Sequence, residues 1–167
     1  MSELEGGVDS ADVSTRPLAG AVIRRGRVLS VVALSLAAAL AALVTLGLVW
    51  GSVPAELASQ WELDGTVSSV APAWTSWLVP LLGATIGVAL PLIASHVLDA
   101  LGRIPLAALG TGLGVLLSCM TAQVVAAQAG ADPAQLPSMP NVFASLALAC
   151  AATALAAALF ARTCVPR

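Results

Sequence analysis

Apolar residues along this chain are collected into four long blocks, which polar segments separate. The blocks cover about residues 28–50, 77–96, 104–127 and 142–161. The hydrocarbon core of a bilayer is about 30 Å thick, and an α-helix needs about 20 residues to cross it. The pattern therefore predicts an all-α membrane protein with four transmembrane helices, which form a bundle.

Prolines and one serine near the ends of the blocks refine this prediction. Pro91 lies within the second block, where its missing N–H predicts a kinked helix. Pro105 stands at the start of the third block and fits the first turn of a helix. Ser52 follows the first block, and because serine caps helix N-termini, we expect the next segment to begin as a short helix.

The basic residues of the chain predict its orientation in the membrane. All seven are arginines: Arg16, Arg24, Arg25, Arg27, Arg103, Arg162 and Arg167. They precede the first block, separate the second from the third, or follow the fourth, whereas residues 51–76 and 128–141 contain no Arg or Lys. Cytoplasmic flanks retain basic residues during insertion. We therefore expect both termini in the cytoplasm and the two arginine-free segments outside.

The N-terminal 22 residues differ from the rest of the chain. They contain no apolar block and carry four acidic side chains, Glu3, Glu5, Asp9 and Asp12. Such a segment has few large apolar residues whose burial would offset the entropy lost on ordering. We expect residues 1–22 to be a disordered acidic tail in front of a transmembrane domain formed by residues 23–167.

Composition narrows the classes of partner. Apolar residues make up 59% of the 167 positions and charged residues 10%, which is more apolar than a soluble domain. The formal net charge is −2, and no basic stripe could follow a phosphate backbone, so the expected partner is the lipid bilayer and not nucleic acid. Cys119, Cys150 and Cys164 have no metal-ligand spacing. We expect free thiols, no metal and no other cofactor.

Two GxxxG spacings indicate where helices could approach closely. Gly83 and Gly87 lie in the second block, and Gly110 and Gly114 lie in the third. Small residues at steps of four let the backbones of membrane helices come into van der Waals contact. A helix contact at these glycines is one interpretation; chance spacing in an alanine-rich chain is the other.

Polar side chains near the blocks suggest no catalytic centre. No ionisable residue stands near the middle of a block, and His96 and Asp99 at the end of the second block are the nearest pair. Their spacing fits either a proton-sensitive pair or a polar cap at the membrane interface. Gln123 in the third block is expected to form a hydrogen bond between helices. The prediction is a non-enzymatic protein.

Residues 51–76 form the most distinctive segment. All four tryptophans lie in it or beside it: Trp50, Trp61, Trp74 and Trp77. Indole rings prefer the headgroup level, so Trp50 and Trp77 are expected to anchor the ends of the helices. Trp61 and Trp74 predict a small structured lid on the outside. Three carboxylates accompany them, Glu56, Glu62 and Asp64, and are either solvated acids or a site for a hard cation such as calcium.

The stretch from Gly51 to Gly65 also resembles a bacterial membrane-protein family of unknown function. Members carry a pattern "LP..IP.HW...G" after the first span, and Pro54, Trp61 and Gly65 match it, with Asp64 in the turn. The same module is similar to the N-terminal part of immunity proteins against a sporulation-delaying peptide toxin. In this chain Ala58 replaces the second proline and Gln60 replaces the histidine.

Two classes of function stand side by side. The resemblance implies a multi-pass protein of the bacterial plasma membrane that acts in toxin immunity or envelope sensing. Its peptide or protein partner would bind at residues 51–76, around Trp61. The alternative is a small transporter or channel subunit built by oligomerisation through the glycines, and the sequence leaves the oligomeric state open.

Overall fold

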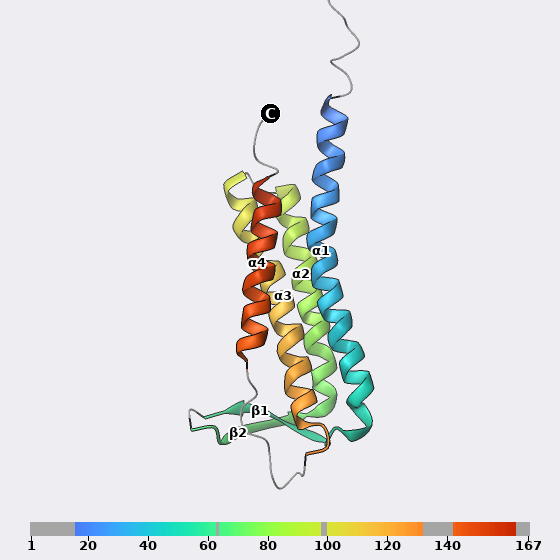
Figure 1. Ribbon diagram of the computed structural model, residues 1–167, viewed down its shortest axis with the longest axis vertical. Coiled ribbons are helices and arrows are strands. Elements are labelled where there is room, and N and C mark those ends of the chain that lie inside the picture. Colours follow the sequence, from blue (N-terminus) through green and yellow to red (C-terminus); the bar gives the residue numbers. More distant parts are fainter. Residues whose placement is uncertain (1–15, 63, 98–99, 132–141, 163–167) are drawn as a thin grey trace, which may run out of the picture.

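The computed structural model describes residues 16–62, 64–97, 100–131 and 142–162. Four helices run side by side, and a β-hairpin lies across one end of them (Figure 1). The helices are α1 (Arg16–Val49), α2 (Leu78–Val97), α3 (Ala100–Gln128) and α4 (Phe143–Ala161). The hairpin consists of β1 (Glu56–Trp61) and β2 (Val67–Pro72), which pair antiparallel, between the 3₁₀ turns η1 (Trp50–Ser52) and η2 (Ala73–Trp77).

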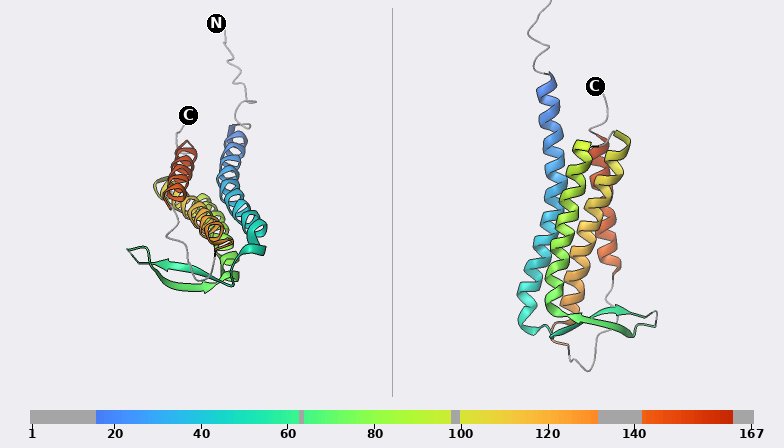
Figure 2. Two further views of the ribbon diagram at one scale, coloured as in Figure 1. Left: turned by 60° about the horizontal axis from the view of Figure 1, so that its bottom comes forward. Right: turned by 180° about the vertical axis from the view of Figure 1, so that it is seen from behind.

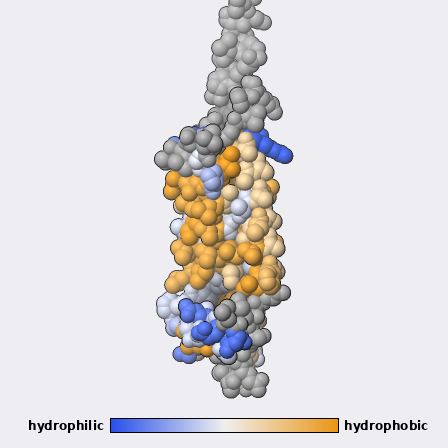
Figure 3. All heavy atoms as spheres, turned by 90° about the vertical axis from the view of Figure 1, so that its left-hand side faces the viewer, coloured by the Kyte–Doolittle hydropathy of each residue, from blue (hydrophilic) through white to orange (hydrophobic). Residues whose placement is uncertain are grey.

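All four predicted spans are present as helices long and apolar enough to cross a membrane. They cover Gly26–Ser52, Ala73–His96, Gly102–Gln128 and Phe143–Ala161. Figure 3 shows the resulting apolar belt between more polar ends. The prediction of a mostly helical, multi-pass membrane protein is therefore confirmed.

The expected boundary of the N-terminal tail is wrong. Helix α1 already begins at Arg16, so residues 16–22 are helical. Pro17 suits the first turn of a helix, and the leucine and alanines after it are good helix formers. With 34 residues, α1 is roughly 50 Å long and extends beyond the other helices at the end opposite the hairpin (Figure 1). Residues 1–15 lie outside the described part.

The prolines occupy the interiors of two helices. Pro91 lies inside α2, where its ring is buried against α3. Pro105 also lies inside a helix, because α3 begins at Ala100, and the expectation that it would occupy a first turn is wrong. Its neighbours Ile104, Leu106 and Ala107 pack into a hydrophobic cluster, and this packing offsets the one backbone hydrogen bond that Pro105 cannot donate.

Helix α3 lies at the centre of the bundle, and its glycines contact α2 directly. A Cβ atom on Gly114 would lie 2.7 Å from the carbonyl oxygen of Gly83, and one on Gly110 would lie 2.6 Å from Cβ of Leu90. A Cβ atom on Gly87 would lie 2.5 Å from the Ser35 side chain of α1. The structure therefore brings the four singled-out glycines to one tightly packed contact, where larger side chains have no room.

Two hydrophobic clusters close the two ends of the bundle. The cluster far from the hairpin draws on all four helices: Val28, Val31, Ala94, Ala107, Ala156 and Phe160. The cluster beneath the hairpin joins α1, α3, β1 and η2 through Leu46, Val125, Leu57 and Ala73. Among the described residues, α4 contributes nothing to this second cluster.

Candidate functional site

Helix α1 ends at Val49 and η1 at Ser52, and the chain does not form the short helix expected after Ser52. Residues 50–52 form a 3₁₀ turn, and the Ser52 hydroxyl donates back to the carbonyl of Val49 at 2.8 Å. Proline disfavours the helical conformation in the residue before it, and Val53 is extended with φ −80° and ψ 130°. Pro54 thus directs the chain into strand β1, and the prediction of a short helix after Ser52 is wrong.

Asp64 and Gly65 form the turn of the hairpin. The Asp64 carboxylate accepts hydrogen bonds from the Thr66 hydroxyl at 2.7 Å and the Thr66 N–H at 2.9 Å. These two bonds, the hydroxyl bond first, hold the pKa of Asp64 below its ordinary value of 3.8. Gly65 has φ +85°, a conformation that glycine adopts without strain. Local turn chemistry therefore closes this hairpin.

Strand β1 contains a bulge close to the turn. Ala58 pairs with Val70 and Gln60 pairs with Ser69, so Ser59 is an extra residue on β1; the next pair is Trp61 with Val67, so Ser68 is an extra residue on β2. The hydroxyl oxygens of Ser59 and Ser69 lie 2.8 Å apart and share a hydrogen bond. A bulge increases the local twist of a strand and redirects the side chains that follow it, here those of Trp61 and Glu62.

A glutamine at the end of α3 fixes the hairpin to the bundle. The Ala58 N–H donates to Oε1 of Gln128 at 2.7 Å, and Nε2 of Gln128 donates to the Ala58 carbonyl at 3.1 Å. Both residues are fully buried. The carboxamide thus pairs with β1 as a neighbouring strand would. The Gly130 N–H also donates to the carbonyl of Ser52 at 2.7 Å, which joins the end of α3 to the end of α1.

The hydrogen bond expected of Gln123 is formed by another glutamine of α3, Gln128. The long-range hydrogen bonds belong to Gln128 and not to Gln123, and they join a helix to a strand. One signal could have indicated this: Gln128 stands where the third apolar block ends, shortly before Gly130, whose φ of +74° ends the helix. A polar side chain at that boundary can reach an element outside the membrane-spanning part.

The tryptophans lie in three different environments. Trp50 and Trp77 contact each other edge to face, with ring centroids 5.2 Å apart, where α1 ends and α2 begins. Trp74 is 60% exposed and lies in η2, and the lid expected from Trp61 and Trp74 stays a prediction. Trp61 is half-buried and lines a groove between the hairpin and the helices.

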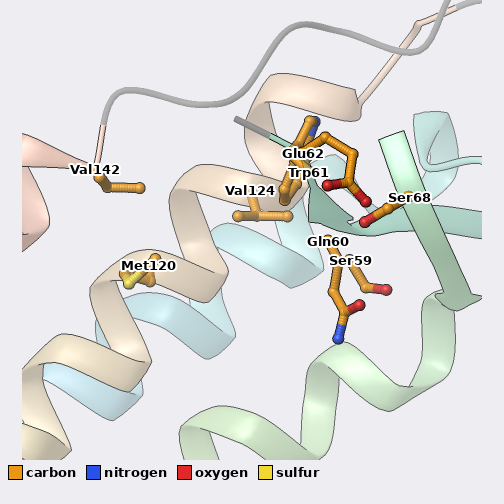
Figure 4. Close-up of a pocket in the computed structure, with 8 residues that line it drawn as sticks. All are labelled: Ser59, Gln60, Trp61, Glu62, Ser68, Met120, Val124 and Val142. Carbon is orange, nitrogen blue, oxygen red and sulfur yellow. The ribbon is translucent and has the colours of Figure 1, made fainter. Parts of the chain in front are cut away.

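That groove, called here the hairpin groove, has a volume of about 480 Å³. Its lining residues come from both strands, α3 and the start of α4: Ser59, Gln60, Trp61, Glu62, Ser68, Met120, Val124 and Val142 (Figure 4). Met120 and Val124 lie at steps of four before Gln128, on the same face of α3. The hydrogen bonds between Ala58 and Gln128 mark where β1 crosses the end of α3. From there the hairpin continues past α4 (Figure 2).

The charges at the hairpin end are all negative. Glu56, Glu62 and Asp64 are exposed, and residues 51–76 and 128–141 contain no Arg or Lys. Within the described ranges, no three His, Cys, Asp or Glu side chains are close enough together to hold a metal ion. The carboxylates therefore form a distributed negative surface along the hairpin.

The other residues singled out in the sequence lie away from the groove. His96 is exposed, and its Nδ1 atom lies 2.9 Å from the Leu92 carbonyl and 2.8 Å from the Ser95 hydroxyl. Its expected partner Asp99 lies outside the described residues. Cys119 and Cys150 are free thiols, as expected, and Cys164 also lies outside the described residues.

No protein-family model, curated protein or solved structure matches this chain. The resemblance drawn from Pro54, Trp61 and Gly65 therefore stays a prediction. The structure gives these three residues places in one unit: Pro54 starts the extended segment, Gly65 turns it, and Trp61 lines the groove. Function has to be argued from that unit.

Proposed function

We propose that this protein is a non-enzymatic component of a bacterial plasma membrane, which recognises a peptide or protein partner outside the cell through the hairpin groove. Toxin immunity or envelope sensing is the role that this arrangement fits. The hairpin groove is the observation that carries the proposal, because it is a concave site of the size that ligands occupy, built on a braced element.

The orientation rests on the distribution of charge between the two ends. Arg27, Arg103 and Arg162 belong to the helix ends opposite the hairpin, and the acids lie on the hairpin. Basic residues stay in the cytoplasm during insertion, which favours a cytoplasmic location for both termini and an outside location for the hairpin.

Single cysteines test this orientation in a variant without the native three. A cysteine at Ser69 should react with a membrane-impermeant thiol reagent in intact cells, and one at Ser14 should react only after lysis. Labelling at Ser14 in intact cells, together with protection at Ser69, would reverse the orientation.

The lining of the groove favours binding over chemistry. Glu62 is the one ionisable side chain among its lining residues, and the Ser59 hydroxyl already shares a hydrogen bond with Ser69. A catalytic site for acyl or phosphoryl transfer needs a nucleophile beside a base, or a metal. An apolar floor with a few polar groups at its edge is typical of recognition.

The hairpin is braced well enough to keep this groove in shape. The Gln128 carboxamide fixes Ala58, and Leu57 and Ala73 pack into the cluster beneath the hairpin. Partners bind more tightly to a site that is ordered before binding, because less conformational entropy is lost.

A filled groove provides the test in cells. Met120→Trp places a large ring on the groove floor, and Leu113→Trp makes the same change on an exposed position of α3 outside the groove. A deletion strain should be more sensitive than the wild type to the peptide fraction of its own spent medium. Wild-type protein and Leu113→Trp should restore resistance, whereas Met120→Trp should not, at equal levels in the membrane.

Full protection by Met120→Trp would contradict a role for the groove. A deletion strain without any change in sensitivity, combined with solute or ion flux through proteoliposomes of the purified protein, would instead favour the transporter or channel alternative.

A further inference from the structure

We propose that the occupant of the hairpin groove is a cationic amphipathic peptide. Its apolar side chains would lie on the floor formed by Met120, Val124 and Val142, and its basic side chains would face the carboxylates along the hairpin. This inference rests on the proposed function and adds the chemistry of the partner.

The floor of the groove suits apolar side chains of varied shape. Met120 and Val124 come from α3 and Val142 precedes α4, so the floor lies at the hairpin-side ends of the membrane-spanning helices (Figure 4). Methionine is unbranched and polarizable, and it adapts to different apolar partners. Trp61, half-buried at the groove, adds an aromatic face that can also attract a cation.

The level of the groove suits a peptide that lies in the membrane interface. Amphipathic peptides bind there with their apolar face toward the hydrocarbon and their charged face toward water. The groove presents the matching arrangement, since its floor is on the helices and its polar residues Ser59, Gln60, Glu62 and Ser68 are on the hairpin.

The sign and spread of the charges favour several basic residues. Glu56 begins β1, Glu62 follows it, and Asp64 lies in the turn, so the carboxylates are distributed over roughly 20 Å of a six-residue strand. No Arg or Lys in residues 51–76 or 128–141 offsets them. A single lipid amine could face only one of these carboxylates, whereas a peptide with spaced basic residues could face them all.

Binding of a defined probe to the full chain in phosphatidylcholine nanodiscs tests this chemistry. The probe is a labelled amphipathic peptide of leucine and lysine, and its control has glutamate at every lysine position. Signal from empty nanodiscs is subtracted. The lysine peptide should bind at low salt, the glutamate peptide should not, and added salt should weaken binding, because exposed charges are screened.

Variants locate the binding. Met120→Trp should weaken binding about tenfold or more, as expected for loss of a central contact, and Leu113→Trp should leave it unchanged. Glu62→Gln should weaken it several-fold. The double variant Glu56→Gln/Asp64→Asn should also weaken it, by a smaller factor, and asparagine keeps the acceptor oxygen that Thr66 needs.

Three results would overturn the inference. The first is equal binding of the glutamate peptide, and the second is unchanged binding by Met120→Trp. The third is displacement of the probe by phosphatidylethanolamine together with no effect of Glu56→Gln/Asp64→Asn, which would identify a lipid amine as the occupant. None of these results decides the cellular test of the proposed function. If the groove bound a partner of different charge, Met120→Trp would still abolish the resistance of the cells.

Discussion

Replacing Gln128 by leucine is expected to release the hairpin from α3. The change keeps a side chain of similar size and removes both hydrogen bonds to Ala58, at 2.7 and 3.1 Å. Ala58 is 0% exposed, so its N–H and carbonyl would be left buried without these partners. A buried polar group without a partner costs about 1–3 kcal/mol, which gives a loss of about 2–6 kcal/mol for the two groups together.

Hydrogen exchange of the Ala58 amide measures this loss directly. Local opening of β1 should become at least tenfold more frequent in Gln128→Leu, because each 1.4 kcal/mol corresponds to about a factor of ten. The four helices should keep their protection, since their packing does not depend on this residue. Gln123→Leu is the matched control, with the same substitution on the same helix, and it should leave the Ala58 amide as protected as in the wild type.

Wild-type protection of Ala58 in Gln128→Leu would refute this reasoning. It would mean that the hydrophobic cluster of Leu46, Leu57, Ala73 and Val125 holds the hairpin without the carboxamide. Equal loss of protection throughout the helices would also refute it, because the side chain would then stabilise the whole bundle and not the hairpin alone.

Three further predictions concern helix packing, the groove and the turn. Gly114→Leu should lower the stability of the bundle in detergent by at least the roughly 1–3 kcal/mol typical of overpacked sites, since even a Cβ atom would lie 2.7 Å from a carbonyl oxygen of α2. Leu113→Ala, on an exposed position, should cost less. Equal stabilities of the two variants would contradict a close helix contact. Trp61→Ala should raise hydrogen exchange in β1 modestly, because the ring is half-buried, and unchanged exchange would show that it supports no part of the hairpin. Thr66→Val should raise the pKa of Asp64 toward 3.8, as measured by an NMR titration. In the wild type, the hydrogen bonds from Thr66 to the ionised Asp64 carboxylate stabilise the turn at any pH above the pKa that Asp64 has in the unfolded chain. This stabilisation is lost as the pH falls through the lower pKa of the folded state.

The amino-acid sequence by itself determined the membrane-spanning architecture. Four apolar blocks of helical length are sufficient, because in lipid each backbone polar group must be satisfied within its own helix. Asp64-Gly65 likewise indicated a turn, since an acceptor side chain followed by a residue tolerant of positive φ acts locally. The sequence therefore predicts features that depend only on the solvent and on residues close together along the chain.

Only the tertiary structure decided what lies at the hairpin end. Whether residues 56–61 form a helix or a strand depended on their pairing with β2, on Pro54 and on a glutamine 70 positions away along the chain. The groove is lined by residues far apart along the chain, from the hairpin, from Met120 and Val124 on the face of α3 that carries Gln128, and from Val142. Pro54 is a local signal for the extended segment, but the strand pairing, the Gln128 contact and the groove arise from contacts between segments that only the folded bundle brings together.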